Sequence, residues 1–153
     1  PDGSTHLLEA GMGTTNGIEV SPDGGTLYVN ESVQRRVWAY DIGEGGALSG
    51  KRLLVAFDDH GLDGMRCDAA GNLYIARYGA GQVAVVSPQG ALLDEVQLRG
   101  ERPTNLAFGG TDGRTVFVTL QDRGAIESFR AAWPGRGPGG GAALQRAGSG
   151  SPR

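Results

Sequence analysis

The sequence has few of the residues that would tie it to a disulfide framework, a membrane or a polyanion. Cys67 is its only cysteine, so no disulfide can form within the chain, and a single thiol fits the reducing cytoplasm. Lys51 is its only lysine, and a net charge of -3 leaves no broad basic field for nucleic acid or an anionic membrane. No apolar run approaches the roughly 20 residues of a transmembrane helix. We therefore expect a soluble, cytoplasmic protein that binds neither nucleic acid nor membrane.

A short pattern occurs three times along the chain. Each copy begins with an Asx residue that opens an apolar segment, at Asn16, Asp63 and Asn105. A turn that contains glycine follows, and then a triplet of residues typical of β-strands. The triplets are Leu27-Tyr28-Val29, Leu73-Tyr74-Ile75 and Val116-Phe117-Val118. The Asx residues lie 47 and 42 residues apart, a period typical of β-propellers, in which each repeat forms one four-stranded blade.

We therefore predict an all-β protein of the β-propeller class, with blades at residues 16–57, 63–98 and 105–130. The run Val83-Ala84-Val85-Val86 is continuously apolar, as expected of a blade strand that is buried on both faces. Aromatic residues of the predicted strands are assigned to packing between blades; these are Tyr28, Trp38, Tyr74 and Phe117. A closed propeller has about four to eight blades, so three blades form only part of a ring.

The chain is accordingly interpreted as a fragment, which begins at Pro1 rather than at methionine. We predict a partial propeller at residues 1–130 and a disordered tail at residues 131–153. Half of the residues from 134 onward are glycine or proline, and such a segment buries too little apolar surface to offset its chain entropy. Because N-terminal sequence is inferred to be missing, periplasmic location or secretion stays open beside the cytoplasm.

The three Asx residues are the first candidates for a functional site. Innermost strands of successive blades surround one axis, so Asn16, Asp63 and Asn105, which open those strands, should converge at one mouth of the channel. A carboxylate with amide carbonyls is a set of hard oxygen ligands that suits Ca²⁺ or Mg²⁺. The alternative is that these residues only form turns, because Asn-Gly and Asp-Gly are common turn formers.

Other polar residues are expected at the same mouth. The second strand of each blade runs antiparallel to the first, so its end returns to that face. Glu31 and Arg77 lie at such ends, and His60 lies just before Asp63. Arg77, His60, Glu31 and Asn105 are candidate substrate-binding residues. For each, the alternative is an ordinary surface or strand-start residue.

The repeats resemble a known family. The segments that carry the resemblance are Asn16-Gly17-Ile18 through Leu27-Tyr28-Val29, Asp63-Gly64-Met65 through Leu73-Tyr74, and Pro103-Thr104-Asn105 through Gly109-Gly110. They are similar to the C-terminal half of the family of senescence marker protein (regucalcin), gluconolactonase and luciferin-regenerating enzyme. The resemblance covers roughly residues 2–130 and implies a six-bladed β-propeller that holds one divalent cation.

On this resemblance, Asn16 and Asp63 are metal ligands, and Asp63 is also the catalytic residue that assists the attacking water. The family's third ligand, a glutamate, and its sugar-binding Arg and Asn have no counterpart here, so this chain alone is predicted to be inactive. The implied cation is Ca²⁺, with Zn²⁺, Mg²⁺ and Mn²⁺ as alternatives. The implied reaction is hydrolysis of a sugar lactone, in which the cation polarises the carbonyl and Asp63 takes a proton from water.

Two other functions stay open beside lactone hydrolysis. A phosphotriesterase-like propeller hydrolase is expected to have a more apolar pocket, and the polar residues at the mouth favour the lactonase. A non-catalytic binding propeller needs no metal; it is favoured if the oxygens of Asn16 and Asp63 lie more than about 5 Å apart, given Ca–O bonds of about 2.3–2.6 Å. The sequence makes no prediction of an oligomeric state.

Overall fold

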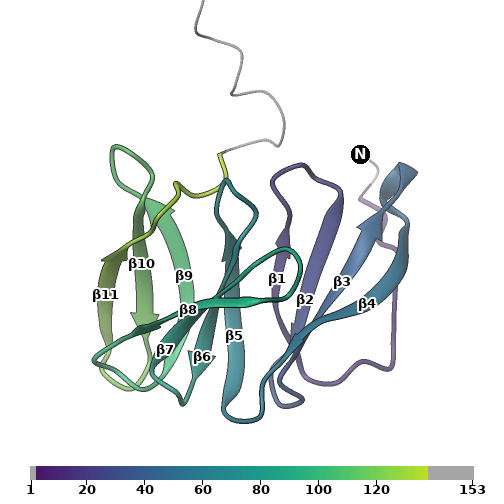
Figure 1. The fold of residues 1–153 in the computed structure, drawn as a ribbon. Helices are drawn as coiled ribbons and strands as arrows, with labels where there is room; N and C mark the ends of the chain where they lie inside the picture. The colour runs from purple at the N-terminus through teal and green to yellow at the C-terminus, as the bar shows by residue number, and fades with distance from the viewer. Residues whose placement is uncertain (1–2, 138–153) are drawn as a thin grey trace, which may run out of the picture.

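A computed structural model describes residues 3–137 as three antiparallel sheets that stand side by side (Figure 1). The first sheet contains β1 (Thr15–Val20), β2 (Thr26–Glu31), β3 (Arg36–Ile42) and β4 (Leu48–Ala56), with a 3-10 turn, η1 (Glu44–Gly46). The second contains β5 (Gly61–Cys67), β6 (Leu73–Tyr78), β7 (Gln82–Val86) and β8 (Leu92–Gln97). The third contains β9 (Pro103–Gly109), β10 (Thr115–Leu120) and β11 (Ala125–Arg130).

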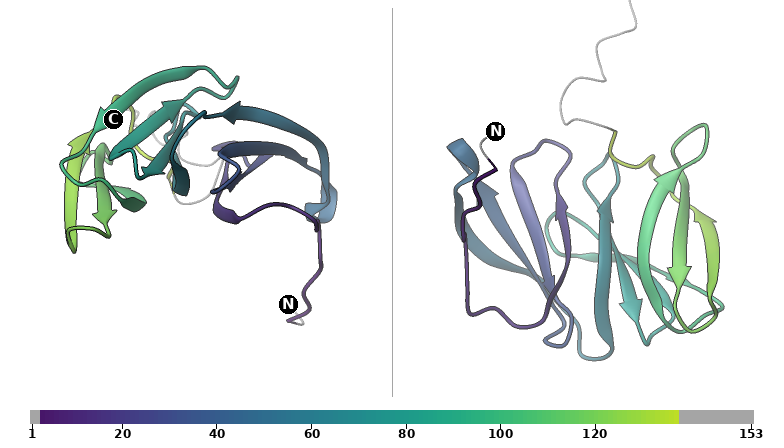
Figure 2. Two further views of the ribbon diagram at one scale, coloured as in Figure 1. Left: turned by 90° about the horizontal axis from the view of Figure 1, so that it is seen from below. Right: turned by 180° about the vertical axis from the view of Figure 1, so that it is seen from behind.

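The sheets are arranged as blades around one side of an axis. Each is a meander in which consecutive strands pair in order, so the first strand of each sheet lies at its inner edge. Strand β5 contacts both β1 and β9, and the end-on view shows the sheets fanned into an arc (Figure 2). The prediction of an all-β, partial β-propeller is therefore confirmed. Residues 3–137 contain no helix of sufficient length and apolarity to cross a bilayer.

Turn chemistry explains why the first two strands of each blade form hairpins. In the first blade, Asp23 Oδ1 accepts hydrogen bonds from the Ser21 hydroxyl and the Gly25 N–H, and Gly24 takes φ of 78°. The left-handed region is open to glycine because it has no Cβ. In the second blade, Asp68 Oδ1 accepts from two backbone N–H groups of the turn. These local bonds fix where each inner strand ends.

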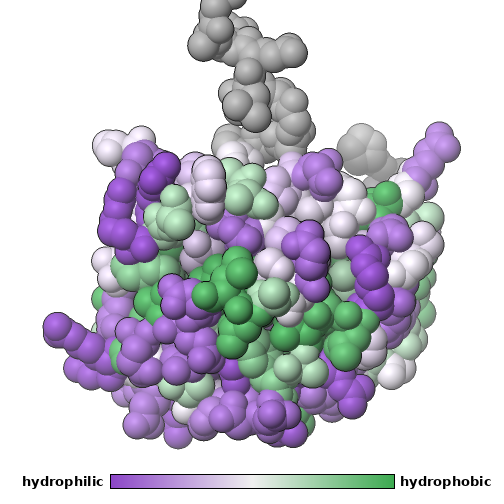
Figure 3. All heavy atoms as spheres, viewed as in Figure 1, coloured by the Kyte–Doolittle hydropathy of each residue, from purple (hydrophilic) through white to green (hydrophobic). Residues whose placement is uncertain are grey.

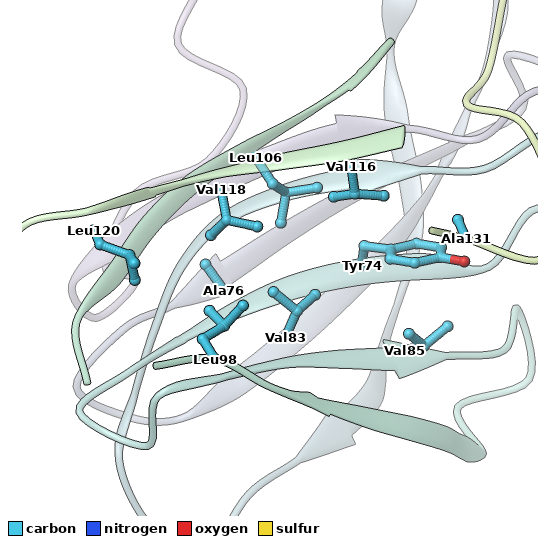
Figure 4. Close-up of a cluster of buried hydrophobic side chains, with 10 residues drawn as sticks. All are labelled: Tyr74, Ala76, Val83, Val85, Leu98, Leu106, Val116, Val118, Leu120 and Ala131. Atoms are coloured by element: carbon cyan, nitrogen blue, oxygen red, sulfur yellow. The ribbon is translucent and has the colours of Figure 1, made fainter. Parts of the chain in front are cut away.

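Two apolar layers hold the blades together, one on each face of the second sheet. The layer toward the third sheet contains Tyr74, Ala76, Val83 and Val85 of the second sheet, which face Leu106, Val116, Val118 and Leu120 of the third (Figure 4). The layer toward the first sheet contains Leu62, Leu73 and Ile75, together with Val37 and Tyr28 of the first sheet. Because β6 is buried on both faces, it reads as a continuous apolar run, as expected of a blade strand.

The outer face of the third sheet corrects the assignment of Phe117 to interblade packing. Phe117 is 44% exposed and Ile126 is 70% exposed, because no sheet among residues 3–137 covers that side. Large apolar side chains are also exposed on the outer strands, at Leu53 of β4 and at Leu92 and Leu93 of β8. Figure 3, viewed as Figure 1, shows apolar atoms gathered near the middle of the visible face, around the position of β8.

The segment Ala131–Gly137, the start of the predicted tail, contacts the first two blades. It crosses from the third sheet to the hairpin turn of the second sheet (Figure 1), where Ala69 donates its N–H to the Pro134 carbonyl at 2.7 Å. Arg136 donates its N–H to the Cys67 carbonyl and forms an ion pair with Glu19 of β1 at 2.7 Å. The segment thus links the three blades at one end. The rest of the predicted tail, residues 138–153, lies outside the described residues.

Truncation of Leu62 tests whether the layer between the first two sheets stabilises the fold. Leu62 is 0% exposed, and a Leu→Ala change in a packed core costs about 2–5 kcal/mol. We expect Leu62→Ala to lower the free energy of unfolding by that amount in urea titrations. Leu53→Ala is the matched control; Leu53 is 51% exposed, so its change should cost less than about 1 kcal/mol. Equal losses for the two variants would contradict the described packing.

Candidate functional site

Asn16 and Asp63 occupy the same kind of backbone irregularity in adjacent blades. In the first sheet, pairing shifts between Thr15 and Ile18, so Asn16 and Gly17 together oppose one residue of β2. In the second sheet, pairing shifts between Leu62 and Met65, so Asp63 and Gly64 together oppose one residue of β6. Such bulges redirect a side chain out of the strand's alternation. Each bulge lies near the start of an inner strand, so the two Asx residues lie at the same end of the blades.

Glycine follows both Asx residues because the inner strands approach closely there. An added Cβ at Gly17 would overlap the Asp63 carbonyl oxygen and would lie 2.8 Å from Met65 Cγ. An added Cβ at Gly64 would overlap the Asn105 side chain and would lie 2.9 Å from Asn105 Cα. Backbone contact at this distance leaves no room for any larger residue. The Asx-Gly pairs therefore serve blade packing and are more than turn formers.

The side chains of Asn16 and Asp63 meet across the two blades. The Asn16 side chain and the Gly64 N–H act on the Asp63 carboxyl as hydrogen-bond donors that lower its pKa. Burial raises the pKa of Asp63 above its ordinary value, and these two hydrogen bonds act in the opposite direction. No cationic side chain is among the groups that shift this pKa. Asp63 is thus a half-buried carboxylate that hydrogen bonds alone stabilise.

Asn105 lies beside this pair but not at the position that the repeat predicts. The register pairs Asn105 with Thr119, and the shift in this sheet falls at Thr104, one residue earlier. Leu106 pairs with Val118 as Met65 pairs with Ile75, so Asn105 corresponds to Gly64, and Thr104 to Asp63. Asn105 Oδ1 accepts the N–H of Leu106 at 2.9 Å. The prediction that Asn105 is equivalent to Asn16 and Asp63 was therefore wrong, because the equivalent residue is Thr104.

Arg77 is buried against the connection that precedes β5 and is not open to solvent. It is 2% exposed, and its Nη2 donates to both the carbonyl and Oδ1 of Asp59 at 2.8 Å. Its guanidinium lies over the Phe57 ring, 3.8 Å from the centroid. Arg77 Nη1 lies 3.8 Å from Glu95 Oε1. The structure therefore gives Arg77 a role in joining the connection before β5 to the blade, rather than an open position for a sugar acid.

His60 and Glu31 come from two different segments, the connection before β5 and the end of β2. His60 precedes β5 with φ of 51°, an uncommon conformation for a non-glycine residue, and its side chain is 45% exposed. Glu31 is 6% exposed and accepts the Gly13 N–H at 2.7 Å. That hydrogen bond is the main reason why the pKa of Glu31 lies below its ordinary value. Glu31 thus fastens the segment that leads into Asn16, whereas His60 is open to solvent.

The sequence places Asn30 at the mouth together with Glu31 but gives it no role. Asn30 of β2 is fully buried and its side-chain amide contacts both bulges. The sequence does contain a clue to its importance. Asparagine is depleted within strands, and the corresponding position in the second blade is Ala76.

The described residues supply some of the ligands that a divalent cation needs. Between them, the neighbouring side chains of Asn16 and Asp63 carry one amide oxygen and one carboxylate, the ligand types that hard divalent cations prefer. Residues 3–137 contain no group of three or more His, Cys, Asp or Glu side chains that could hold a metal ion. Within residues 3–137, Asn16 and Asp63 thus offer two oxygen ligands, and no cationic side chain is among the groups that shift the pKa of Asp63.

Comparison with known proteins assigns the chain to a family. The family model described as the SMP-30/gluconolactonase/LRE-like region matches residues 1–122. The chain belongs to the SMP-30/gluconolactonase/LRE-like family. It is 33% identical over 123 residues to a 6-deoxy-6-sulfogluconolactonase of Pseudomonas putida, covering 78% of this chain and 42% of that protein. It is 32% identical over 129 residues to a gluconolactonase of Zymomonas mobilis, covering 78% of this chain and 36% of that protein.

The solved structures agree with this family membership. A gluconolactonase of Xanthomonas campestris matches with a TM-score of 0.66 and 29% identity, covering 77% of this chain and 38% of that one. The resemblance inferred from the repeats is therefore confirmed. The chain spans about two fifths of the length of the curated relatives that it matches.

Replacement of Gly64 by alanine tests the close approach of β5 and β9. The added Cβ overlaps Asn105, and such overpacking costs about 1–3 kcal/mol. We expect Gly64→Ala to lower the free energy of unfolding by that amount and to displace the Asn105 resonances. Gly61→Ala in the same strand is the control, since its Cβ would lie 3.4 Å from the nearest atom, Ser32 Oγ. If the two variants are equally stable, the glycine is not required by packing.

Proposed function

We propose that the protein of which this chain forms part is a lactone hydrolase that opens a sugar lactone. Its family and the names of its relatives support this reaction. One observation links the proposal to particular residues. The Asn16 side chain interacts with the half-buried Asp63 carboxyl at the start of adjacent inner strands. The proposal includes a cytoplasmic location, which the single cysteine supports.

Asn16 and Asp63 are the residues that would hold one divalent cation. Ca²⁺ is proposed first because both ligands are hard oxygens, and Mg²⁺, Mn²⁺ and Zn²⁺ are the alternatives. A half-buried carboxylate whose pKa burial has raised gains more from a nearby positive charge than an exposed one does. When bound, the cation would supply electrophilic activation of the lactone carbonyl and stabilise its developing negative charge.

The chain's own residues then position water and accept a proton. Asp63 presents a carboxylate oxygen as the general base for the attacking water. The Asn16 amide orients that carboxylate through their hydrogen bond, and Glu31 holds the segment before Asn16 through Gly13. His60, exposed beside the site, is proposed as a substrate contact. Asn105 lines the same edge from the third blade, next to Gly64.

The geometry supports this proposal over the two alternatives. A binding propeller without metal has no need of an Asx pair on one rim, whereas here Asn16 is close enough to Asp63 to lower the pKa of its carboxyl. A phosphotriesterase-like hydrolase is favoured by an apolar pocket, whereas the third blade places the polar side chain of Asn105 against Gly64, next to Asp63. Polar groups of this kind suit the hydroxyl groups of a sugar lactone.

Calcium titration of the chain tests the ligand assignment. With one carboxylate and one amide, we expect weak binding, with a Kd of about 10⁻³ M, in isothermal titration calorimetry. Asp63→Asn removes the only charge of the pair and should weaken binding at least about tenfold. Asp112→Asn is the control, because Asp112 pairs with Arg130 in the third sheet and should not affect binding. Unchanged affinity in Asp63→Asn would remove Asp63 from the site.

Lactonase assays test the reaction itself. The described blades supply only two ligands, so we expect the 153-residue chain to show near-background hydrolysis of gluconolactone with Ca²⁺ or Zn²⁺ added. The intact protein with its upstream coding sequence restored should hydrolyse the lactone. Asp63→Asn in that protein should lower kcat by about 10²-fold or more, the contribution typical of a general base. An intact Asp63→Asn enzyme with undiminished kcat would contradict the base assignment.

A further inference from the structure

Asn30 lies behind the two bulges, at the boundary between the first and second blades. It is in β2 and is fully buried. Register places it opposite the Asn16-Gly17 bulge, since Val29 pairs with Ile18 and Glu31 pairs with Thr15. A buried carboxamide needs partners for both its oxygen and its nitrogen, so its contacts identify what it stabilises.

The Asn30 side chain joins one backbone group from each bulge. Its Oδ1 accepts the N–H of Gly17 at 2.9 Å, and its Nδ2 donates to the carbonyl oxygen of Asp63 at 2.6 Å. A bulge disrupts the regular ladder and leaves backbone groups that need other partners. One planar amide therefore ties the residue after Asn16 to the Asp63 backbone across the blade boundary.

A carboxamide suits these two bonds better than any similar side chain. Aspartate has nearly the same shape and could accept from Gly17, but an ionised carboxylate cannot donate to the Asp63 carbonyl. Alanine offers neither group. The corresponding positions opposite the other two bulges are Ala76 and Thr119. Since blades form with alanine or threonine there, the propeller architecture does not itself require asparagine at this position.

We propose that Asn30 is a positioning residue that fixes the Asn16 and Asp63 side chains relative to each other across the blade boundary. Its consequence for cation affinity rests on the proposed function, whereas the geometric claim concerns the metal-free chain. Residues that orient metal ligands typically change metal affinity by about 10–100-fold when they are replaced. Asn30 acts through the backbone of Gly17 and Asp63, and it contacts neither of the two ligand side chains in its own hydrogen bonds.

The first test uses NMR of the metal-free chain. We expect a nuclear Overhauser effect between the Asn16 side-chain amide and the Asp63 β-protons, and slow hydrogen exchange at the Gly17 N–H. Asn30→Ala should abolish the first and speed the exchange of Gly17 at least about tenfold. Asn72→Ala is the matched control, because Asn72 donates its side-chain amide to Asp68 at 2.9 Å in the turn at the other end of the second blade. It should alter neither observation.

The conservative variant separates the two bonds of Asn30. Asn30→Asp keeps the acceptor for Gly17, so slow exchange at Gly17 should persist, while the Asn16–Asp63 Overhauser effect weakens with the loss of the donor. Should Asn30→Ala fail to fold, this variant carries the test. Persistence of the Overhauser effect at full strength in a folded Asn30 variant would overturn the positioning role.

Calcium titration of the same variants completes the test. If the parent chain binds Ca²⁺, Asn30→Ala should weaken binding by about 10–100-fold and Asn72→Ala should not. A folded Asn30→Ala chain with parental affinity would overturn the inference. If the parent chain binds no Ca²⁺, the proposed function fails, and the NMR comparison still decides whether Asn30 sets the Asn16–Asp63 geometry.

Discussion

The close approach of the inner strands β1, β5 and β9 is the constraint on which the site depends. Gly17 and Gly64 allow it, because a Cβ at either position would overlap the next blade. The same two residues complete the bulges that redirect Asn16 and Asp63. Blade packing and side-chain placement are therefore consequences of the same Asx-Gly pairs. A larger residue after either Asx would separate the blades and the two functional groups together.

Among residues 3–137, this arrangement half-buries the Asp63 carboxylate and forms no ion pair with it, which is costly unless other groups compensate. Asn16 and the Gly64 N–H compensate Asp63 only in part, since burial still raises its pKa. The buried guanidinium of Arg77, in the strand that pairs with β5, is engaged by Asp59. Such local conflicts with stability are expected at functional sites. A divalent cation between Asn16 and Asp63 is the simplest group that would resolve this one.

Much of the fold could be predicted because the repeat is local and regular. The Asx-Gly pairs, the glycine turns and the apolar triplets mark the first two strands of each blade, and the convergence of Asn16 and Asp63 follows from them. The position of a bulge is not encoded in spacing, so Asn105 was aligned one residue away from its true equivalent. The pairing of Arg77 with Asp59 joins residues 18 positions apart, and no local pattern signals it. Phe117 was assigned to the core by its type, although its burial depends on what covers the third sheet.

The central claim is that Asn16 and Asp63 share one divalent cation at the inner edge of adjacent blades. The most direct measurement is NMR line broadening of the chain during titration with substoichiometric Mn²⁺, whose unpaired electrons broaden only nearby resonances. The account predicts that the Asn16 side-chain amide and the Asp63 resonances broaden first and together, before those of the exposed acids Asp94 and Asp112. Broadening that begins at those exposed acids, or that reaches Asp63 without Asn16, would contradict it.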